Sequence, residues 1–294
     1  MGELQLSKIL LARTHPSTIK RPVLLLSYPG FLTFLTRFPQ LIHRLYCSLT
    51  STLVVYWEVS NMVAADIETR LNQDVPKRTK ICIYCGSSPG YSPKHMEAAR
   101  KLAQLMATKK IDLVYGGGTV GLMGEVAKTL VSISGPDAVH GIIPEPLVKF
   151  ERDDTYRSIC SENKMPIPDK MTYGRTTVVK DMHTRKRMMA EEVFAGGPGS
   201  GFIALSGGYG TIEEILEAAT WVQLGIHSRG VCLLNIDGFF DGILKWIKQA
   251  VEEHFIRPAN AAIIVTVQTP EDAIDALLHY RVPTSTLQLD WSRI

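Results

Sequence analysis

Cysteine is scarce in this chain, and it occurs an odd number of times. Five cysteines among 294 residues are too few for a disulfide framework and favour a reducing compartment. Cys82 and Cys85 form a C-x-x-C pair, but no second pair or histidine cluster accompanies them, and they lie in a strand-like apolar run. We therefore expect two buried strand cysteines rather than a metal or redox site.

The sequence also lacks a long apolar run and a strong excess of charge of one sign. Its most apolar stretch, residues 23–35, is interrupted by Pro29-Gly30 and is too short to cross a bilayer. The formal net charge is only +3 at pH 7, so composition does not call for nucleic acid or an anionic membrane as partner. We expect a cytoplasmic protein that binds neither.

Carboxylates are nearly absent from the first sixty residues. Only Glu3 and Glu58 are acidic there, against six lysines and arginines, and the segment is rich in Leu, Ser, Thr and Pro. Three interpretations fit: a transit peptide, which would place the protein in mitochondria, a disordered tail, or an extended gene model whose translation begins at Met62. We favour the last two and expect residues 1–75 to be a poorly ordered, dispensable basic extension.

From Lys80 onward, strand and helix patterns alternate. The expected strands are residues 80–85, 111–115, 139–143, 201–205, 231–236 and 263–267. The expected helices are residues 92–110, a segment around 122–131, and residues 176–193, 211–224, 239–255 and 270–278, with a long loop or insertion at 145–172. This alternation predicts an α/β protein with a Rossmann-like, doubly wound parallel sheet in a three-layer α/β/α arrangement. The domain would span residues 76–282, with a C-terminal tail at 283–294.

Three of the expected strands end in glycine-rich segments, at residues 86–88, 116–119 and 207–211. Ligands bind beyond the carboxyl ends of the strands in such sheets, so three of these segments on one edge favour a nucleotide crevice. The glycines at 116, 118 and 121 have dinucleotide-binding spacing, but no acidic residue ends the next strand to hold a ribose. That absence weakens a dehydrogenase interpretation.

The segment after residue 205 is the most informative in the chain, because glycines lead from a strand directly into a helix. Glycines let the backbone approach a ligand closely, and the first N–H groups of a helix, with its dipole, bind phosphate. Glu213 and Glu214 follow at once. A carboxylate near a sugar C1′ can stabilise an oxocarbenium-like transition state, activate water or hold ribose hydroxyls. For Glu217 we accept the simpler explanation that first-turn carboxylates favour the helix dipole.

A basic pair lies on the helix expected at 178–193. Its buried apolar stripe is expected at Met182, Met189 and Val193. Arg185 and Lys186 flank that stripe, whereas Arg187 points to solvent. A basic pair held against apolar surface has an anionic partner, either a ligand, which we favour, or a carboxylate of the same or another helix. His183 fits a structural hydrogen bond and a ligand role equally well.

These motifs resemble the Lonely Guy (LOG) family of cytokinin riboside 5′-monophosphate phosphoribohydrolases, which are often mislabelled as lysine decarboxylases. The resemblance rests on Asp181-Met182-His183-x-Arg185-Lys186 and on Gly207-Gly208-Tyr209-Gly210-Thr211-x-Glu213-Glu214. Residues 85–88, 115–124 and 221–227 are also similar, and the likeness covers about residues 80–280. It implies a Rossmann-like fold, a homodimer with sites near the subunit interface, and hydrolysis of a nucleoside 5′-monophosphate to free base and ribose 5-phosphate. It implies no metal and no organic cofactor.

The resemblance also implies roles for individual residues. Arg185 and Glu214 would be catalytic: Glu214 would stabilise developing positive charge or position water, and Arg185 would hold the phosphoribosyl group or assist the departing base. The glycine loop would hold the 5′-phosphate. The substrate-binding set is Ser87, Gly117, Gly118, Lys186, Gly207, Gly208, Tyr209, Gly210, Thr211, Glu213 and Thr220.

Two features depart from the family pattern. Ser206 stands where the loop normally begins with proline, which loosens the start of the loop without removing a ligand group. Residues 195–201 and about 161–170 are longer than usual, and we expect them to affect a rim or the dimer contact.

The runner-up function is a nucleotide-binding or sensing protein on the same fold, which would not need the Arg185–Glu214 pair. A pyridoxal phosphate-dependent decarboxylase would need a Schiff-base lysine, and no lysine here lies in a recognisable cofactor site. Adenine and N6-prenylated adenine are both left open as the base.

Overall fold

A computed structural model describes residues 77–150, 159–160, 166–284, 286–287 and 289–291. The N-terminal extension expected at residues 1–75, with its three interpretations, lies outside the described residues, as do parts of residues 145–172. Among the helices that are described, none has the length and hydrophobicity needed to cross a membrane.

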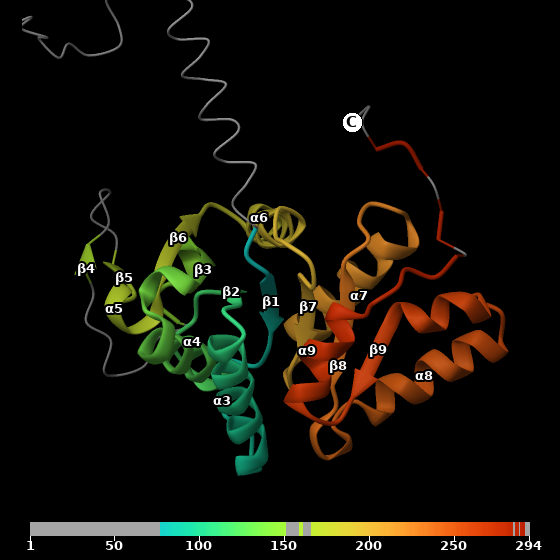
Figure 1. Cartoon of the computed structure of the whole chain (residues 1–294), viewed down its shortest axis with the longest axis horizontal. Coiled ribbons are helices and arrows are strands. Elements are labelled where there is room, and N and C mark those ends of the chain that lie inside the picture. Colours follow the sequence, from blue (N-terminus) through green and yellow to red (C-terminus); the bar gives the residue numbers. More distant parts are fainter. Residues whose placement is uncertain (1–76, 151–158, 161–165, 285, 288, 292–294) are drawn as a thin grey trace, which may run out of the picture. The chain divides into compact units, whose positions relative to one another are not determined.

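Seven parallel strands form one sheet in the order β6-β3-β2-β1-β7-β8-β9 (Figure 1). The strands are β1 (Lys80–Tyr84), β2 (Asp112–Tyr115), β3 (Val139–Pro144), β6 (Arg175–Val179), β7 (Gly201–Ala204), β8 (Gly230–Leu234) and β9 (Ile264–Val267). The chain adds β2, β3 and β6 on one side of β1, then crosses over to add β7, β8 and β9 on the other. The strand order therefore reverses between β1 and β7, and the crevice of such a sheet lies at their carboxyl ends.

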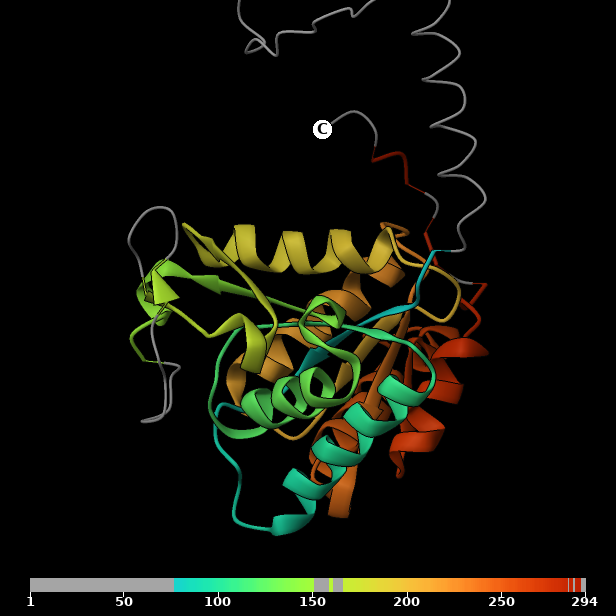
Figure 2. The same ribbon diagram turned by 60° about the vertical axis from the view of Figure 1, so that its left-hand side comes forward.

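Helices cover both faces of this sheet, as predicted. One face carries α3 (Pro93–Thr108), α4 (Gly121–Ser134) and α9 (Pro270–Leu278), and the other carries α6 (Met182–Phe194), α7 (Tyr209–Gln223) and α8 (Asp241–Glu252). Figure 2 shows α6 on the opposite side of the sheet from α3 and α4.

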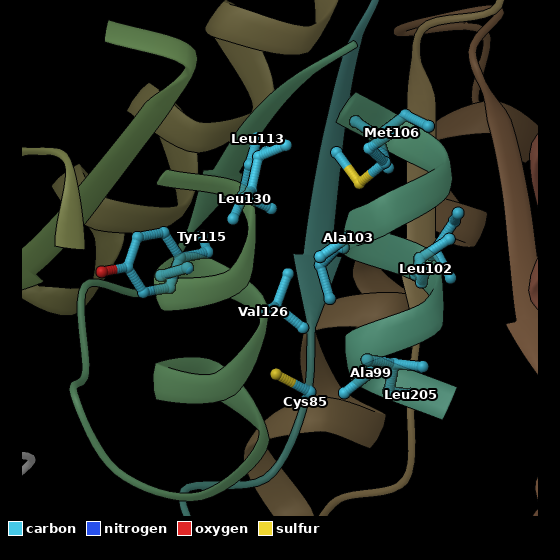
Figure 3. Close-up of a cluster of buried hydrophobic side chains, with 14 of the residues drawn as sticks. Cys85, Ala99, Leu102, Ala103, Met106, Leu113, Tyr115, Val126, Leu130 and Leu205 are labelled. Carbon is cyan, nitrogen blue, oxygen red and sulfur yellow. The ribbon is translucent and has the colours of Figure 1, made fainter. Parts of the chain in front are cut away.

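Alternate residues of β1 divide between the two cores. Ile81 and Ile83 belong to the core under α3 and α4, whereas Cys82 and Tyr84 belong to the core under α6 and α7, because successive strand side chains point to opposite faces. Figure 3 shows the first of these cores, in which side chains of α3 pack beside strand residues and α4. Cys82 and Cys85 are both buried, as the sequence predicted.

The sheet has one strand more than predicted, because the helix expected at 176–193 begins later. Residues 175–179 form β6, and α6 starts at Met182. The run Thr176-Thr177-Val178-Val179 is β-branched, which favours a strand. Asp181 then caps α6 by accepting the Thr184 N–H at 2.7 Å.

Smaller differences affect the loop and the termini. The loop expected at 145–172 contains β4 (Ile159–Cys160), β5 (Pro166–Ile167) and α5 (Lys170–Tyr173), and the longer segment near 161–170 lies partly outside the described residues. In the C-terminal tail, the Leu287 N–H donates to the Gln223 carbonyl at 2.9 Å and Trp291 Nε1 donates to the Leu224 carbonyl at 3.1 Å. The tail thus supplies donors to the last carbonyls of α7.

Candidate active site

The three glycine-rich segments meet at the carboxyl edge of the sheet. The Gly86 N–H donates to the Ser206 carbonyl at 3.0 Å, and the Gly86 carbonyl accepts the Leu122 N–H at 3.1 Å. At Gly121, where φ is +57°, a Cβ would lie 2.4 Å from the backbone nitrogen of Ser88, so only glycine lets these segments approach so closely. Ser87 is exposed at this junction.

The loop from Gly207 to Thr211 forms the amino end of α7. A Cβ at Gly207 would lie 2.1 Å from Thr211 Oγ1, whereas a Cβ at Gly208 or Gly210 would meet nothing within 4 Å. The fold therefore needs glycine at 207, but at 208 and 210 glycine only keeps the surface bare. The first N–H groups of α7 lie next to this open surface, in the arrangement that binds phosphate. Tyr209, between these two glycines, is 98% exposed.

Arg185 is buried at the same edge, with 6% exposure. Its Nε donates to the Ile142 carbonyl at 3.1 Å and its Nη2 to the Gly116 carbonyl at 2.8 Å, so the guanidinium spans the ends of β3 and β2. A Cβ at Gly116 would lie 1.9 Å from Nη2, and this explains the first glycine of that segment. Gly117 has φ of +77°, a backbone conformation that favours glycine, and Gly118 is buried beside it.

Lys186 joins α6 to α7. Its Nζ lies 2.5 Å from Glu213 Oε1 and 3.1 Å from Glu217 Oε1. Burial works to lower the pKa of Lys186, but the hydrogen bonds to Glu213 and Glu217 outweigh it and raise that pKa. The anionic partners of Lys186 within this chain are thus carboxylates of another helix. The dipole explanation for Glu217 is wrong, because α7 begins at Tyr209 and no acidic residue lies in its first turn.

Glu214 is half-buried on α7, and its charge affects the pKa values of buried β1 residues. Burial is the main cause of the raised pKa of Cys82; Glu214 raises this pKa further and Arg185 opposes the rise. Glu214 also adds to the burial that raises the pKa of Tyr84. Arg185 lies near the carboxyl end of β1, because its partner Gly116 directly follows Tyr115, the β2 residue that pairs with Ile83 of β1. Glu214 lies on α7, in the turn after the residues that the glycine loop contributes to this helix.

Other predicted positions lie apart from this cluster. Thr220 is exposed and donates to the Leu216 carbonyl at 2.8 Å; it follows Tyr209 by eleven residues, about 16 Å along α7. Within one chain it does not join the glycine loop. His183 is exposed. Arg187 is also exposed and forms a 3.5 Å ion pair with Glu191, so its prediction as a solvated charge is confirmed.

The buried stripe expected on α6 is one residue shorter than predicted. Met189 and Val193 are buried, but Met182 is 40% exposed, because it is the first residue of α6. The longer segment at 195–201 was expected to affect a rim or the dimer contact. It leads into the start of β7, at the edge opposite the glycine loops, so it forms no rim around those loops, and its part in a dimer contact stays a prediction. The Arg229 guanidinium holds it there by donating to the Phe194 and Gly196 carbonyls at 2.6 and 2.8 Å.

The sequence interpretation missed two side-chain groups. Ser206 Oγ lies 3.0 Å from His95 Nδ1, directly before the glycine loop. At the other edge of the sheet, Glu192 binds Lys80 and His140. In the sequence, the first group is marked only by a serine where proline is usual. The second is marked only by polar residues where apolar ones are usual.

Comparison with known proteins agrees with these motifs. The family model described as "Possible lysine decarboxylase" matches residues 123–277. A "Bifunctional cytokinin biosynthesis protein" of Fusarium pseudograminearum is 54% identical over 202 residues, covering 69% of this chain and 40% of that protein. The cytokinin riboside 5′-monophosphate phosphoribohydrolase LOG7 of Arabidopsis thaliana is 41% identical over 217 residues, covering 73% of this chain and 89% of that protein.

A further relative has a similar name. The probable cytokinin riboside 5′-monophosphate phosphoribohydrolase LOGL2 of Oryza sativa subsp. japonica is 43% identical over 201 residues, covering 68% of this chain and 72% of that protein. The chain thus spans less than half the length of the Fusarium protein but most of each plant protein. The matched region includes the glycine loop, Arg185 and Glu214, and on these grounds the chain belongs to the LOG family.

Proposed function

We propose that this chain hydrolyses the N-glycosidic bond of cytokinin riboside 5′-monophosphates, and of AMP, to free base and ribose 5-phosphate. The observation that carries the proposal is that Arg185 and Glu214 lie at the same edge of the sheet as a bare, glycine-lined helix amino end. The names of the plant relatives at 41% and 43% identity support the same activity, and the name of the Fusarium relative supports a part in cytokinin biosynthesis.

The 5′-phosphate binds at the amino end of α7. Its oxygens accept hydrogen bonds from the first N–H groups of the helix, and the helix dipole adds about half a positive charge there. The open surface at Gly208 and Gly210 gives the phosphate room to reach these groups. The requirement for this phosphate separates the proposed enzyme from one that acts on nucleosides.

Glu214 then lies where the sugar must be. It follows Gly210 by four residues, which places it on the same helix face one turn further on, about 6 Å away. A ribose whose phosphate sits at the first turn extends along this face towards Glu214. There the carboxylate stabilises the oxocarbenium-like transition state or positions the attacking water.

Arg185 holds the opposite wall of the site. Its bonds to the Ile142 and Gly116 carbonyls fix the ends of β3 and β2, and its positive charge lies near the carboxyl end of β1. As the C1′–N bond breaks, the electron pair leaves with the base. A nearby guanidinium favours that departure, while water supplies the hydroxyl to C1′ and a proton to the base.

The active unit that we propose is a cytoplasmic homodimer. Thr220 supports the dimer, because it lies on an exposed part of α7 far from its own glycine loop, where a partner's site is the natural place for a substrate contact. Sedimentation of the full chain, with and without nucleotide, would show the dimer, and a monomer that retains full activity would contradict it.

Product analysis tests the activity. The full chain is incubated with AMP and with isopentenyladenosine 5′-monophosphate, and free base and ribose 5-phosphate are separated and quantified. Release of equal amounts of both products is expected, and the ratio of the two rates measures recognition of the prenyl group. Nucleotide binding without base release would instead support a sensor on the same fold.

A further inference from the structure

Ser206 connects β7 to the glycine loop that begins α7. Its side chain is held by α3, which lies on the opposite face of the sheet from α7. Ser206 is 7% exposed, and its Oγ lies 3.0 Å from Nδ1 of His95 on α3. Its carbonyl accepts the Gly86 N–H at 3.0 Å. The residue that starts the loop is therefore fixed both by the end of β1 and by a side chain of α3.

The His95 ring is itself held between two further segments. It makes an edge contact with Phe239, with ring centroids 5.7 Å apart and planes at 75°. On another side it faces Gly90 in the segment after β1, where an added Cβ would lie only 3.1 Å from His95 Cδ2. One side chain thus lies against the segments that follow β1, β7 and β8. Such a ring has little rotamer freedom and can hold its partner in one place.

We propose that His95 is a positioning residue for the phosphate loop, acting through Ser206. Proline at the start of a loop restricts φ covalently; here the His95–Ser206 hydrogen bond restrains the same position. When the bond is lost, the segment from Gly207 to Thr211 must be ordered by the ligand itself, and that ordering reduces affinity. This inference rests on the proposed function only for the identity of the ligand, a ribose 5-phosphate group.

The test measures binding and turnover separately. Calorimetry with ribose 5-phosphate reports the loop without requiring hydrolysis, and steady-state kinetics with AMP gives KM and kcat. Loss of one hydrogen bond is expected to weaken binding and raise KM about fivefold in Ser206→Ala and in His95→Phe. kcat should stay unchanged, because the loop contacts the phosphate equally in ground and transition states.

Combined and conservative variants separate positioning from general damage. The double variant, Ser206→Ala with His95→Phe, should lose no more affinity for ribose 5-phosphate than either single variant, because both changes remove the same hydrogen bond. Ser206→Pro should restore affinity in the His95→Phe background, and His95→Asn should stay near wild type because it keeps a hydrogen-bonding atom. Lys94→Ala is the matched control: it removes the exposed 2.7 Å pair with Asp237 from the same turn of α3 and should change nothing.

Several outcomes would overturn the inference. They are unchanged affinity in both single variants, losses that multiply in the double variant, or no rescue by Ser206→Pro. A wild-type chain that binds ribose 5-phosphate but hydrolyses neither nucleotide would refute the proposed function, while the affinities would still decide the role of His95. Failure of the wild type to bind ribose 5-phosphate would refute both.

Discussion

Helix α6 carries charged residues at both ends, and the two ends use them differently. At its start, Arg185 donates to carbonyls at the ends of two strands, and Lys186 reaches across to α7. At its other end, Glu192 accepts a 2.6 Å hydrogen bond from His140 and pairs with Lys80 and Arg175. His140, Lys80 and Arg175 lie near the beginnings of β3, β1 and β6, respectively.

The difference separates the functions of the two sheet edges. At the amino edge, the charges bind one another and join strands to the helix. At the carboxyl edge, Arg185 holds the glycine segment after β2, and Glu214 lies one turn beyond the open amino end of α7. Substitutions at the carboxyl edge should therefore reduce activity, and those at the amino edge should reduce stability and leave activity unchanged.

The largest effect is expected from Glu214→Gln. The change keeps the size of the side chain and removes the charge that stabilises the transition state, so base release should fall by about 10³-fold. The midpoint of thermal unfolding should stay within a few degrees of wild type. Retention of more than a tenth of the activity, measured as base released from AMP, would exclude Glu214 as the key carboxylate.

Arg185→Ala should follow, with activity falling about 10²-fold. Because two buried carbonyls lose their donor, this variant should also lose about 2–3 kcal/mol of unfolding free energy. Arg187→Ala, two residues further along the same helix, is the control. It removes only an exposed ion pair, and its activity should change less than twofold. Equal losses of activity in Arg185→Ala and Arg187→Ala would contradict the orientation of α6, in which Arg185 is buried and Arg187 is exposed.

Gly208→Val tests the open phosphate surface. The added side chain projects into space that is empty within the chain, so it should obstruct the ligand and raise KM for AMP at least tenfold, about 1.4 kcal/mol. Gly242→Val is the matched control, since Gly242 on α8 is also open at its Cβ and lies outside the site. An unchanged KM in Gly208→Val would place the phosphate elsewhere.

Glu192→Gln tests the amino edge and should have the smallest effect. The hydrogen bond from His140, aided by Lys80, lowers the pKa of Glu192 from 4.5 to about 2 despite partial burial. A lowered pKa stabilises the folded state above pH 4.5, and this contribution is lost as the pH falls from 4.5 towards 2.

Urea unfolding should accordingly show wild type about 1 kcal/mol more stable than Glu192→Gln at pH 7, allowing for solvent screening. The difference in unfolding free energy between wild type and Glu192→Gln should be smaller at pH 3, and the kcat of the variant at pH 7 should be unchanged. A difference in unfolding free energy that does not depend on pH, or a loss of kcat in Glu192→Gln, would contradict the assignment of stability to the amino edge and activity to the carboxyl edge.

Local sequence patterns were sufficient to predict the layers and the edge of the sheet at which the glycine segments meet. Apolar periodicity marked most helices and strands, and glycines at 86, 116 and 207 marked the strand ends that meet. The strand at 175–179 was missed because its apolar residues run straight into the helical spacing that follows. The start of α7 was placed at Thr211, since Tyr209 and Gly210 have little helical preference and only tertiary structure puts them in a first turn.

Side-chain partners that are distant in sequence could not be predicted. Ser206 and His95 are 111 residues apart, and His140 and Glu192 are 52 apart. Periodicity reports which face a residue occupies, but not which residue it meets there. For the same reason Lys186 was correctly placed beside the apolar stripe, while its bonds to Glu213 and Glu217 on α7 appeared only in the structure.

The central claim is that the bare amino end of α7 holds a phosphate while Glu214 acts one turn away. The most direct measurement compares kcat/KM for isopentenyladenosine 5′-monophosphate with that for the riboside without phosphate. We expect release of free base from the monophosphate and at least 10²-fold lower kcat/KM for the riboside, because the riboside lacks the charged group that α7 binds. Similar values for the two compounds, or no base released from the monophosphate, would contradict it.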